Sequence, residues 1–437
     1  MQRRNILLIA AATLPLSGCT ILGGEEAPAL PKPSLERCAP DELNAEQQAR
    51  QNEVDRFLAT WYQESGWVIL ATKQTRSCDV IDYLDPASVP GSEIEAPPDP
   101  VYELPPEVMA QGTEIDDDYD AQGLAWSVPV IRPRFAPYVF GEVPAASLSA
   151  FIRQTVPGAP GSSARLYAGV ALPVQNTGAR TFVNPYDGKV DAFGTNILEM
   201  AILCPGPDRD KTLDMVGVMA SRDRANFELT VPSTRLQVEF LTAGDRAIGP
   251  GIGGIEGAVM KAGVYIGQKT TGFIGRAGAP YAPGAVLTPV STVGGAIYES
   301  RFEIQLFGGN WWIAHNGNWL GYYPREGLDQ IEFSACEAHW YGEVRDRNTE
   351  TWDVTDMGSG EFAAEGLGRA AHFRLPQYLD AFAAPQWPDA ALPSEPNNPL
   401  CYTSSGLQDE SATLGPQFQR ILYVGGPGGD SPGCTYP

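Results

Sequence analysis

Three acidic residues stand among apolar neighbours, and paired acids in such surroundings can hydrolyse polar bonds. They are Glu199, Asp214 and Glu343. An acid within an apolar run is expected to be buried, and burial favours its protonated form. Two carboxyls in one partly dry site can act together, one protonated as a general acid and one ionised as a general base. The sequence therefore offers these residues as candidates for acid–base catalysis.

Each of these acids also has a structural interpretation. Glu343 could form a surface ion pair with Arg345 on the same strand face, worth at most about 1 kcal/mol. Asp214 could accept hydrogen bonds in a turn. Glu199 precedes the turn Pro205–Pro207 and reaches the site of Asp214 if the two flanking strands pair as a hairpin. We therefore treat Glu343 and Asp214 as the first candidate pair and Glu199 as a reserve acid.

Aromatic side chains near these acids could bind a substrate. We expect Trp312, Trp319, Tyr322 and Tyr341 to line a subsite in which apolar rings stack on aromatic faces. Because strand residues alternate between two faces, part of the wider aromatic group belongs in the core.

Other kinds of site are disfavoured. The sequence has no CxxC pair and its three histidines are far apart, which argues against a zinc site. It has no GxSxG motif for a hydrolase nucleophile. The glycine-rich run 251–257 departs from GxGxxG and is better explained as a turn between strands. The net charge of −23 repels phosphate backbones, so nucleic acid is a poor partner candidate. We expect no metal and no cofactor.

The elements that carry the candidates are predicted to be strands. From about residue 164, apolar and polar residues alternate, for example over 298–306 and 236–240, as in strands with one wet and one dry face. Helical patterns are too few for a βαβ fold. We therefore predict a mainly β protein, an antiparallel β-sandwich over residues 164–437.

A smaller N-terminal part is expected over residues 41–130. Helical spacing of apolar residues predicts a helix within 41–64, followed by a short strand over 67–72. Many prolines and acids over 84–120 indicate an irregular segment. The sandwich is thus preceded by a small helix-containing segment.

The first residues resemble an export signal. Arg3 and Arg4 precede the apolar stretch 6–16, and Leu16-Ser17-Gly18-Cys19 matches the bacterial lipobox. This pattern predicts a signal peptide over residues 1–18, lipidation of Cys19 and a tether over 19–40. Thr20 in place of aspartate favours the outer membrane over the inner one. The paired arginines also fit a loose twin-arginine signal, so both export routes stay open.

Six cysteines remain after Cys19, and an even number in an oxidising compartment suggests disulfides. Six cysteines allow fifteen connectivities, among them Cys38–Cys78 with Cys204–Cys336.

Several motifs in the second half occur together in one order. They are Gly309-Asn310-Trp311-Trp312, Gly321-Tyr322-Tyr323-Pro324, Trp340–Val344, Thr355–Gly360, Gly366–Arg374, Cys401-Tyr402 and Gly425–Gly428, closing at Cys434. In this order they resemble the neprosin family of secreted glutamic peptidases. The resemblance covers about residues 164–437 and implies a neprosin-like β-sandwich with a disulfide between Cys401 and Cys434.

The resemblance also implies a mechanism. Members are understood to use two carboxylic acids across a cleft to cleave peptide bonds next to proline at acidic pH. Glu343 falls at the position of one catalytic glutamate, Asp214 at that of the other, and Glu199 at that of a glutamine. Aspartate shortens the reach by one methylene, and a displacement of about 1 Å can cost roughly 100-fold in rate.

Three functions are compatible with these features. The first is a cell-envelope endopeptidase, anchored through Cys19, that uses Asp214 and Glu343 on a peptide or protein substrate. The second is a catalytically weakened or inactive lipoprotein that binds peptide or glycan. The third is a carbohydrate-active enzyme, because paired carboxyls also suit glycosidic bonds.

Overall fold

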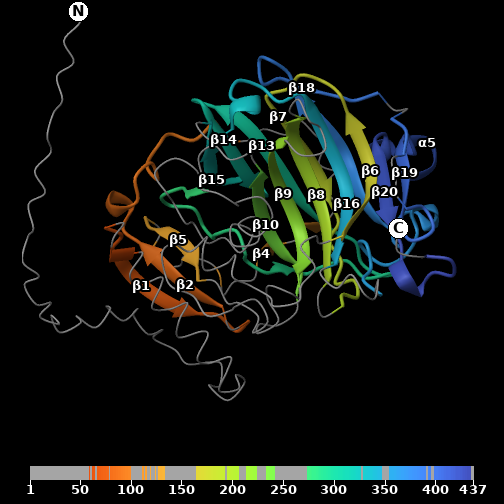
Figure 1. Cartoon of the computed structure of the whole chain (residues 1–437), viewed down its shortest axis with the longest axis horizontal. Coiled ribbons are helices and arrows are strands. Elements are labelled where there is room, and N and C mark those ends of the chain that lie inside the picture. Colours follow the sequence, from red (N-terminus) through yellow and green to blue (C-terminus); the bar gives the residue numbers. More distant parts are fainter. Residues whose placement is uncertain are drawn as a thin grey trace, which may run out of the picture.

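The computed structural model describes the sandwich and part of the N-terminal region (Figure 1). The described residues are 59, 62–63, 66–77, 79–99, 111–112, 114–115, 119, 124, 126–132, 164–191, 194–205, 213–223, 233–241, 273–325, 328–346, 354–389, 392–394 and 398–434. The expected signal peptide and tether, Cys19, most of the expected N-terminal helix, Cys38 and Cys78 lie outside them.

Two antiparallel sheets make up the sandwich. The smaller has the order β10-β9-β8-β16-β6. Its strands are β6 (Ala164–Leu172), β8 (Gly194–Pro205), β9 (Leu213–Asp223), β10 (Arg235–Leu241) and β16 (Glu337–Asp346). Strands β8, β9 and β16 pair without a bulge over nearly their whole length, so the faces of this sheet follow strictly from residue parity.

The larger sheet has the order β11-β15-β14-β13-β7-β17-β20-β19, and β18 and β3 pair with β17 and β13. Its strands are β3 (Gln111–Gly112), β7 (Gly178–Val183), β11 (Ile274–Gly275), β13 (Tyr298–Phe307), β14 (Asn310–His315), β15 (Asn318–Pro324), β17 (Ala371–Leu379), β18 (Pro385–Gln386), β19 (Thr403–Gln408) and β20 (Ile421–Gly425). Figure 1 shows this sheet behind the smaller one.

One hydrophobic core fills the space between the two sheets. The smaller sheet contributes residues such as Val216, Val218 and Trp340, and the larger contributes Phe302 and Ile304. These residues recur at every second position of their strands, as the alternating pattern requires. The predicted antiparallel β-sandwich is therefore confirmed.

Helical segments are short in the described part of the chain. They are η2 (Pro86–Ser88), η7 (Asp329–Ile331), η8 (Ala363–Glu365), α5 (Ser411–Leu414), η9 (Pro416–Phe418) and η10 (Gly428–Asp430). None of the helices in the described ranges is long and apolar enough to cross a membrane.

A three-stranded sheet from the N-terminal part packs beside the sandwich (Figure 1). Its order is β1-β2-β5, with β1 (Ile69–Gln74), β2 (Val80–Leu84) and β5 (Val128–Ile131). The expected strand 67–72 is close to β1. The expected irregular segment also contains β4 (Glu114–Ile115), which pairs with β12 (Leu287–Thr288). Ile81 and Ile131 belong to the same hydrophobic core as the sandwich residues, so this core is continuous between the N-terminal sheet and the sandwich.

Two disulfides close the sandwich. Cys401 is bonded to Cys434, as the resemblance implies, and Cys204 at the end of β8 is bonded to Cys336 just before β16. The second bond joins segments 132 residues apart in the sequence.

Candidate functional site

Glu199 and Glu343 lie on the same face of the smaller sheet. In the β8–β16 register, Glu199 is opposite Tyr341, and Ile197 is opposite Glu343. Directly opposed residues of an antiparallel pair point to the same side, as do residues two apart. Their neighbours Trp340 and Val344 point into the core, so the two glutamates point away from it.

The two carboxyls are close enough to act on one substrate. Glu343 is the diagonal neighbour of Glu199 in this register, and such neighbours are about 7–8 Å apart at their backbones, within reach of long side chains. Glu199 is 0% exposed and Glu343 1%, while Tyr341 between them is 8% exposed. We call Glu199, Glu343 and Tyr341 the outer-face acid site.

A third acid, Glu239, approaches this site from β10. Glu239 is opposite Gly217 on β9, and Gly217 is opposite Ala201 on β8. The point where a Cβ of residue 217 would sit is 3.1 Å from Cδ of Glu199 and 3.5 Å from Cγ of Glu239. Both side chains therefore lie over the same glycine. Glu239 is not among the predicted site residues, although its alternation with Val238 and Phe240 indicates that it faces away from the core.

The surroundings of the acid site are apolar and aromatic. Ala201, Leu203, Met215 and Tyr341 form a buried cluster with Tyr167 packed against it, separate from the main core. The rings of Tyr167 and Tyr341 meet edge to face with centroids 5.6 Å apart. Burial, and then the charges of the three glutamates, raise the pKa of Tyr341 well above its usual value of 10.0. Its hydroxyl therefore keeps its proton and can donate a hydrogen bond.

Asp214 does not belong to this site, so the expected pairing of Asp214 with Glu343 is wrong. Asp214 is opposite Cys204 on β8 and shares a face with Val216, which lies in the core. Its carboxyl accepts a hydrogen bond of 2.6 Å from the backbone N–H of Gln330 in η7. The odd spacing between positions 214 and 199 in this hairpin places the two acids on opposite faces of the sheet. The structural interpretation, an aspartate bonded to a turn, describes Asp214 correctly.

Three of the four expected substrate-lining aromatics are also elsewhere. Trp312, Trp319 and Tyr322 form a buried cluster on the larger sheet with Ile274, with Ala96 packed against it. The hydroxyl of Tyr322 donates to the carbonyl of Gly91, and the indole N–H of Trp319 to that of Pro98. Sequence segment 91–98 thus packs on these rings, and only Tyr341 of the predicted set adjoins Glu343.

The N-terminal sheet is attached to the smaller sheet by a buried ion pair. A guanidinium nitrogen of Arg235 at the start of β10 lies 2.6 Å from a carboxylate oxygen of Asp79, and both side chains are at most 1% exposed. The hydroxyl of Tyr119 donates to the same carboxylate. No local sequence signal indicated this contact, because Asp79 and Arg235 are 156 residues apart.

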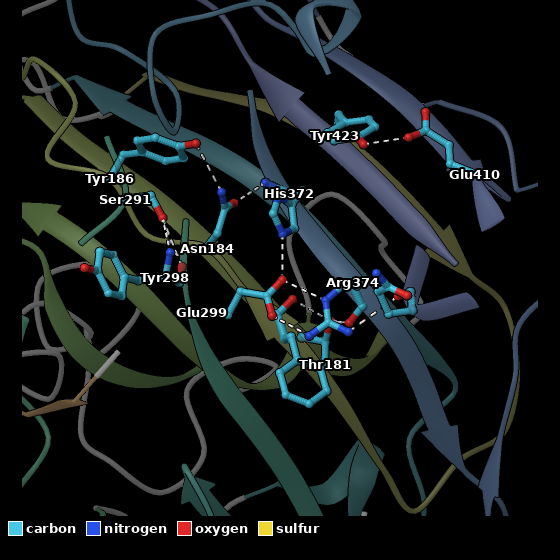
Figure 2. Close-up of polar contacts among 12 residues, drawn as sticks. Thr181, Asn184, Tyr186, Ser291, Tyr298, Glu299, His372, Arg374, Glu410 and Tyr423 are labelled. Carbon is cyan, nitrogen blue, oxygen red and sulfur yellow. Dashed lines mark hydrogen bonds and ion pairs between the residues drawn. The ribbon is translucent and has the colours of Figure 1, made fainter. Parts of the chain in front are cut away.

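A second buried polar cluster lies on the larger sheet (Figure 2). Glu299 accepts hydrogen bonds of 2.8 Å from Nε of Arg374 and from Nε2 of His372, and a further one from Arg374. The guanidinium lies 4.5 Å from the ring centroid of Phe182. Burial by itself would raise the pKa of Glu299, but the hydrogen bonds and charges of Arg374 and His372 lower it to about 2.

This cluster corrects one detail of the strand pattern. The alternation over 298–306 predicts a wet face carrying Glu299 and Glu303, yet both are buried. Because Glu299 is held ionised by two fixed partners, the cluster fits a structural ion pair better than a catalytic acid.

His315 forms a further buried contact. It lies 3.2 Å from the Oγ of Ser300 and 2.9 Å from the hydroxyl of Tyr281. Burial, and then Arg301, lower the pKa of His315 to about 3, so the ring is neutral above that pH. With all three residues packed in the core, this is a satisfied interior histidine.

Within the described ranges, no group of three or more His, Cys, Asp or Glu side chains is placed to hold a metal ion.

The comparison with known families matches one model. The model described as Neprosin matches residues 262–427. This span contains Glu343, Tyr341 and the paired-tryptophan strand, while Glu199, Asp214 and Glu239 precede it.

Proposed function

Because this chain belongs to the neprosin family, which is associated with peptidase activity, we propose that it is an endopeptidase in which Glu199 and Glu343 form the catalytic pair. The observation that carries the proposal is that these two carboxyls share the outer face of the smaller sheet across one strand pair, while Asp214 faces the core. Glu199, introduced above as the reserve acid, thus takes the role expected of Asp214.

The strand order supports a division of roles between the two acids. Among the described side chains, Glu199 on β8 has acids on both sides, Glu343 on β16 and Glu239 on β10, whereas Glu343 has Glu199 on one side and Tyr167 of β6 on the other. Like charges nearby favour the protonated form of a carboxyl. Glu199 is therefore the general acid, and Glu343, ionised, is the general base.

The reaction then follows a paired-carboxyl mechanism. Glu343 removes a proton from a water molecule, whose oxygen attacks the carbonyl carbon of the peptide bond. The phenol of Tyr341 donates a hydrogen bond to the negative charge that develops on the carbonyl oxygen. Glu199 gives its proton to the leaving amine as the C–N bond breaks. Since Glu199 must be protonated at the start, activity is highest at acidic pH.

Access to the acids requires a local change of conformation, because both side chains are almost wholly buried. Tyr341 is the most exposed of the three residues of the outer-face acid site, and Tyr167 beside it is half-buried, so substrate approaches over these two rings. Their two rings offer a surface for a proline ring, in keeping with cleavage next to proline.

Purified protein tests the pair. The protein is incubated with a proline-containing peptide at pH values from 3 to 7. The assay is done with fresh protein and with protein that has been pre-incubated at pH 4. Glu343→Gln and Glu199→Gln are each expected to lower kcat by about 100-fold or more, the usual range for general acid–base groups. Asp214→Asn is the matched control from the core face and should keep kcat, with folding checked by thermal unfolding. Loss of cleavage in folded Asp214→Asn, with Glu199→Gln unaffected, would overturn the assignment.

Burial of both acids also favours a second function, a non-catalytic lipoprotein that binds peptide or glycan. This alternative predicts no cleavage at any pH, and retained binding of the peptide by Glu343→Gln. In either case we propose that the protein is anchored to the cell envelope, in the outer membrane, through a lipid on Cys19. Mass spectrometry of the membrane fraction should then find the chain beginning at an acylated Cys19.

A further inference from the structure

We propose that Glu239 is a positioning residue that holds Glu199 in its protonated form across the space left by Gly217. The inference rests on the proposed function, in which Glu199 is the general acid. It adds a residue from β10 to a site formed by β8 and β16.

The geometry places Glu199 and Glu239 together although their strands are not neighbours. Strand β9 lies between β8 and β10, and its side chains would normally separate the two acids. At position 217 there is no side chain, and a Cβ there would collide with the carboxylate of Glu199 and come within 3.5 Å of Cγ of Glu239. Glycine is therefore what lets the two acids meet over β9.

The backbone at Gly217 needs no glycine for its own conformation. It lies within regular antiparallel pairing to both neighbours, between Met215 and Met219. Glycine inside a strand weakens the strand and often marks a close approach of another group. Here the approaching group is the carboxyl of Glu199.

Among the described residues, the charged groups that face Glu199 are mainly acidic. From β16 come Glu343, Tyr341 and, further along the strand, His339; from β10 come Glu239, the neutral Gln237 and Arg235. Arg235 is engaged by Asp79, and His339 lies 2.8 Å from Glu337. The effect of the three glutamates on this face is visible in the pKa of Tyr341, which burial and all three charges raise.

Removing the charge of Glu239 should therefore let Glu199 lose its proton at lower pH. In the pH profile of kcat, the alkaline limb therefore shifts to lower pH. The acid limb, which the titration of Glu343 sets, stays at about the same pH. A like charge close to a buried carboxyl commonly shifts its titration by about one pH unit or more. On the alkaline limb this corresponds to a loss of about 10-fold in kcat at fixed pH.

The kinetic test compares the parent with Glu239→Gln and Glu239→Asp. Gln keeps the shape without the charge, and Asp keeps the charge. We expect Glu239→Gln to shift the alkaline limb of the kcat profile to lower pH by about one pH unit, with little change in KM. Glu239→Asp should keep this limb at the pH of the parent. A uniform drop in kcat at all pH values, or the same limb in Glu239→Gln as in the parent, would overturn the inference.

A spectroscopic test does not depend on cleavage. The infrared band of a protonated carboxyl is followed with pH, and the difference between parent and Glu199→Gln isolates the band of Glu199. That band should vanish at lower pH in Glu239→Gln than in the parent. Gly217→Ala, whose methyl would displace the carboxylate of Glu199, should shift the band in the same direction while keeping both acids. An unchanged titration in both variants contradicts the inference even if the protein cleaves no peptide, which separates its failure from that of the proposed function.

Discussion

Glu199 and Tyr341 lie directly opposite each other across the β8–β16 pair, on the face of the smaller sheet that points away from the core. The phenol is therefore next to the general acid and on the path by which substrate would enter. Because burial and then the nearby glutamates raise its pKa well above 10.0, it stays a hydrogen-bond donor at every pH at which the protein could act.

We predict that Tyr341→Phe lowers kcat by roughly 10²–10³-fold, the usual cost of removing one donor to a developing oxyanion. The KM should change little, since the ring remains for stacking. Steady-state kinetics at pH 4 with the proline-containing peptide measure both constants.

Tyr323→Phe is the matched control for this prediction. Tyr323 is also fully buried and its pKa is also raised by burial and then by Glu239 and Glu199, but its ring packs in the main core against Phe240. Equal losses of kcat in both variants would indicate that the hydroxyl of Tyr341 has no particular role in the reaction.

The alternating pattern predicts the faces of single strands well. The apolar neighbours of Asp214 predict that it is buried, and this is correct. The hairpin of β8 and β9, which was only a condition for placing Glu199, is present. The pattern of one strand does not give its register with the neighbouring strand. A shift of one residue in that register moves every side chain to the other face of the sheet. The pairing of Asp214 with Glu343 that the resemblance implies fails for this reason, because the strand register puts the two acids on opposite faces of the sheet.

Contacts between distant segments are outside the reach of local pattern. Glu299 and Arg374 are 75 residues apart, and each reads as an ordinary polar residue on a solvated strand face. The same limit applies to segment 91–98, which packs on Trp319 and Tyr322 and removes them from the predicted subsite. Composition and motif order therefore predict the fold, whereas tertiary packing decides which residues share a site.

The second prediction concerns the attachment of the N-terminal sheet. Arg235 and Asp79 form a salt bridge with both side chains buried, and Arg235 also donates to the carbonyl of Gly284. Removing one partner leaves a buried charge without compensation, which typically costs about 3–5 kcal/mol. Asp79→Asn should therefore lower the free energy of unfolding by that amount, as measured by urea denaturation at pH 7.

A surface ion pair provides the comparison for Asp79→Asn. Lys189 and Asp430 are 2.9 Å apart with side chains 54% and 51% exposed. Such pairs contribute at most about 1 kcal/mol, so Asp430→Asn should have little effect. If the two variants unfold at the same urea concentration, the Asp79–Arg235 contact does not stabilise the N-terminal sheet on the sandwich.

The last prediction concerns acid stability and the buried cluster in Figure 2. In the folded protein the pKa of Glu299 is about 2, below its ordinary value of 4.5, because the hydrogen bonds and charges of Arg374 and His372 outweigh the effect of burial. A group whose pKa is lowered by folding stabilises the fold above its unfolded pKa, and this stabilisation is lost as pH falls through the folded value. The contribution of Glu299 to the free energy of unfolding is therefore complete above about pH 5 and declines between 4.5 and 2.

Glu299→Gln should cost about 3–5 kcal/mol at pH 6, since it leaves Arg374 buried without its carboxylate, and the difference from the parent should shrink as the pH approaches 2. Urea unfolding at pH 6, 4 and 2.5 measures this, with Glu361→Gln, from the more exposed pair Glu361–Arg369, as the control. A difference that stays constant over this range would contradict the assignment, because it would mean that Glu299 titrates alike in the folded and unfolded chain. The expected result would mean that the larger sheet keeps its central ion pair over most of the acidic range in which the proposed peptidase works.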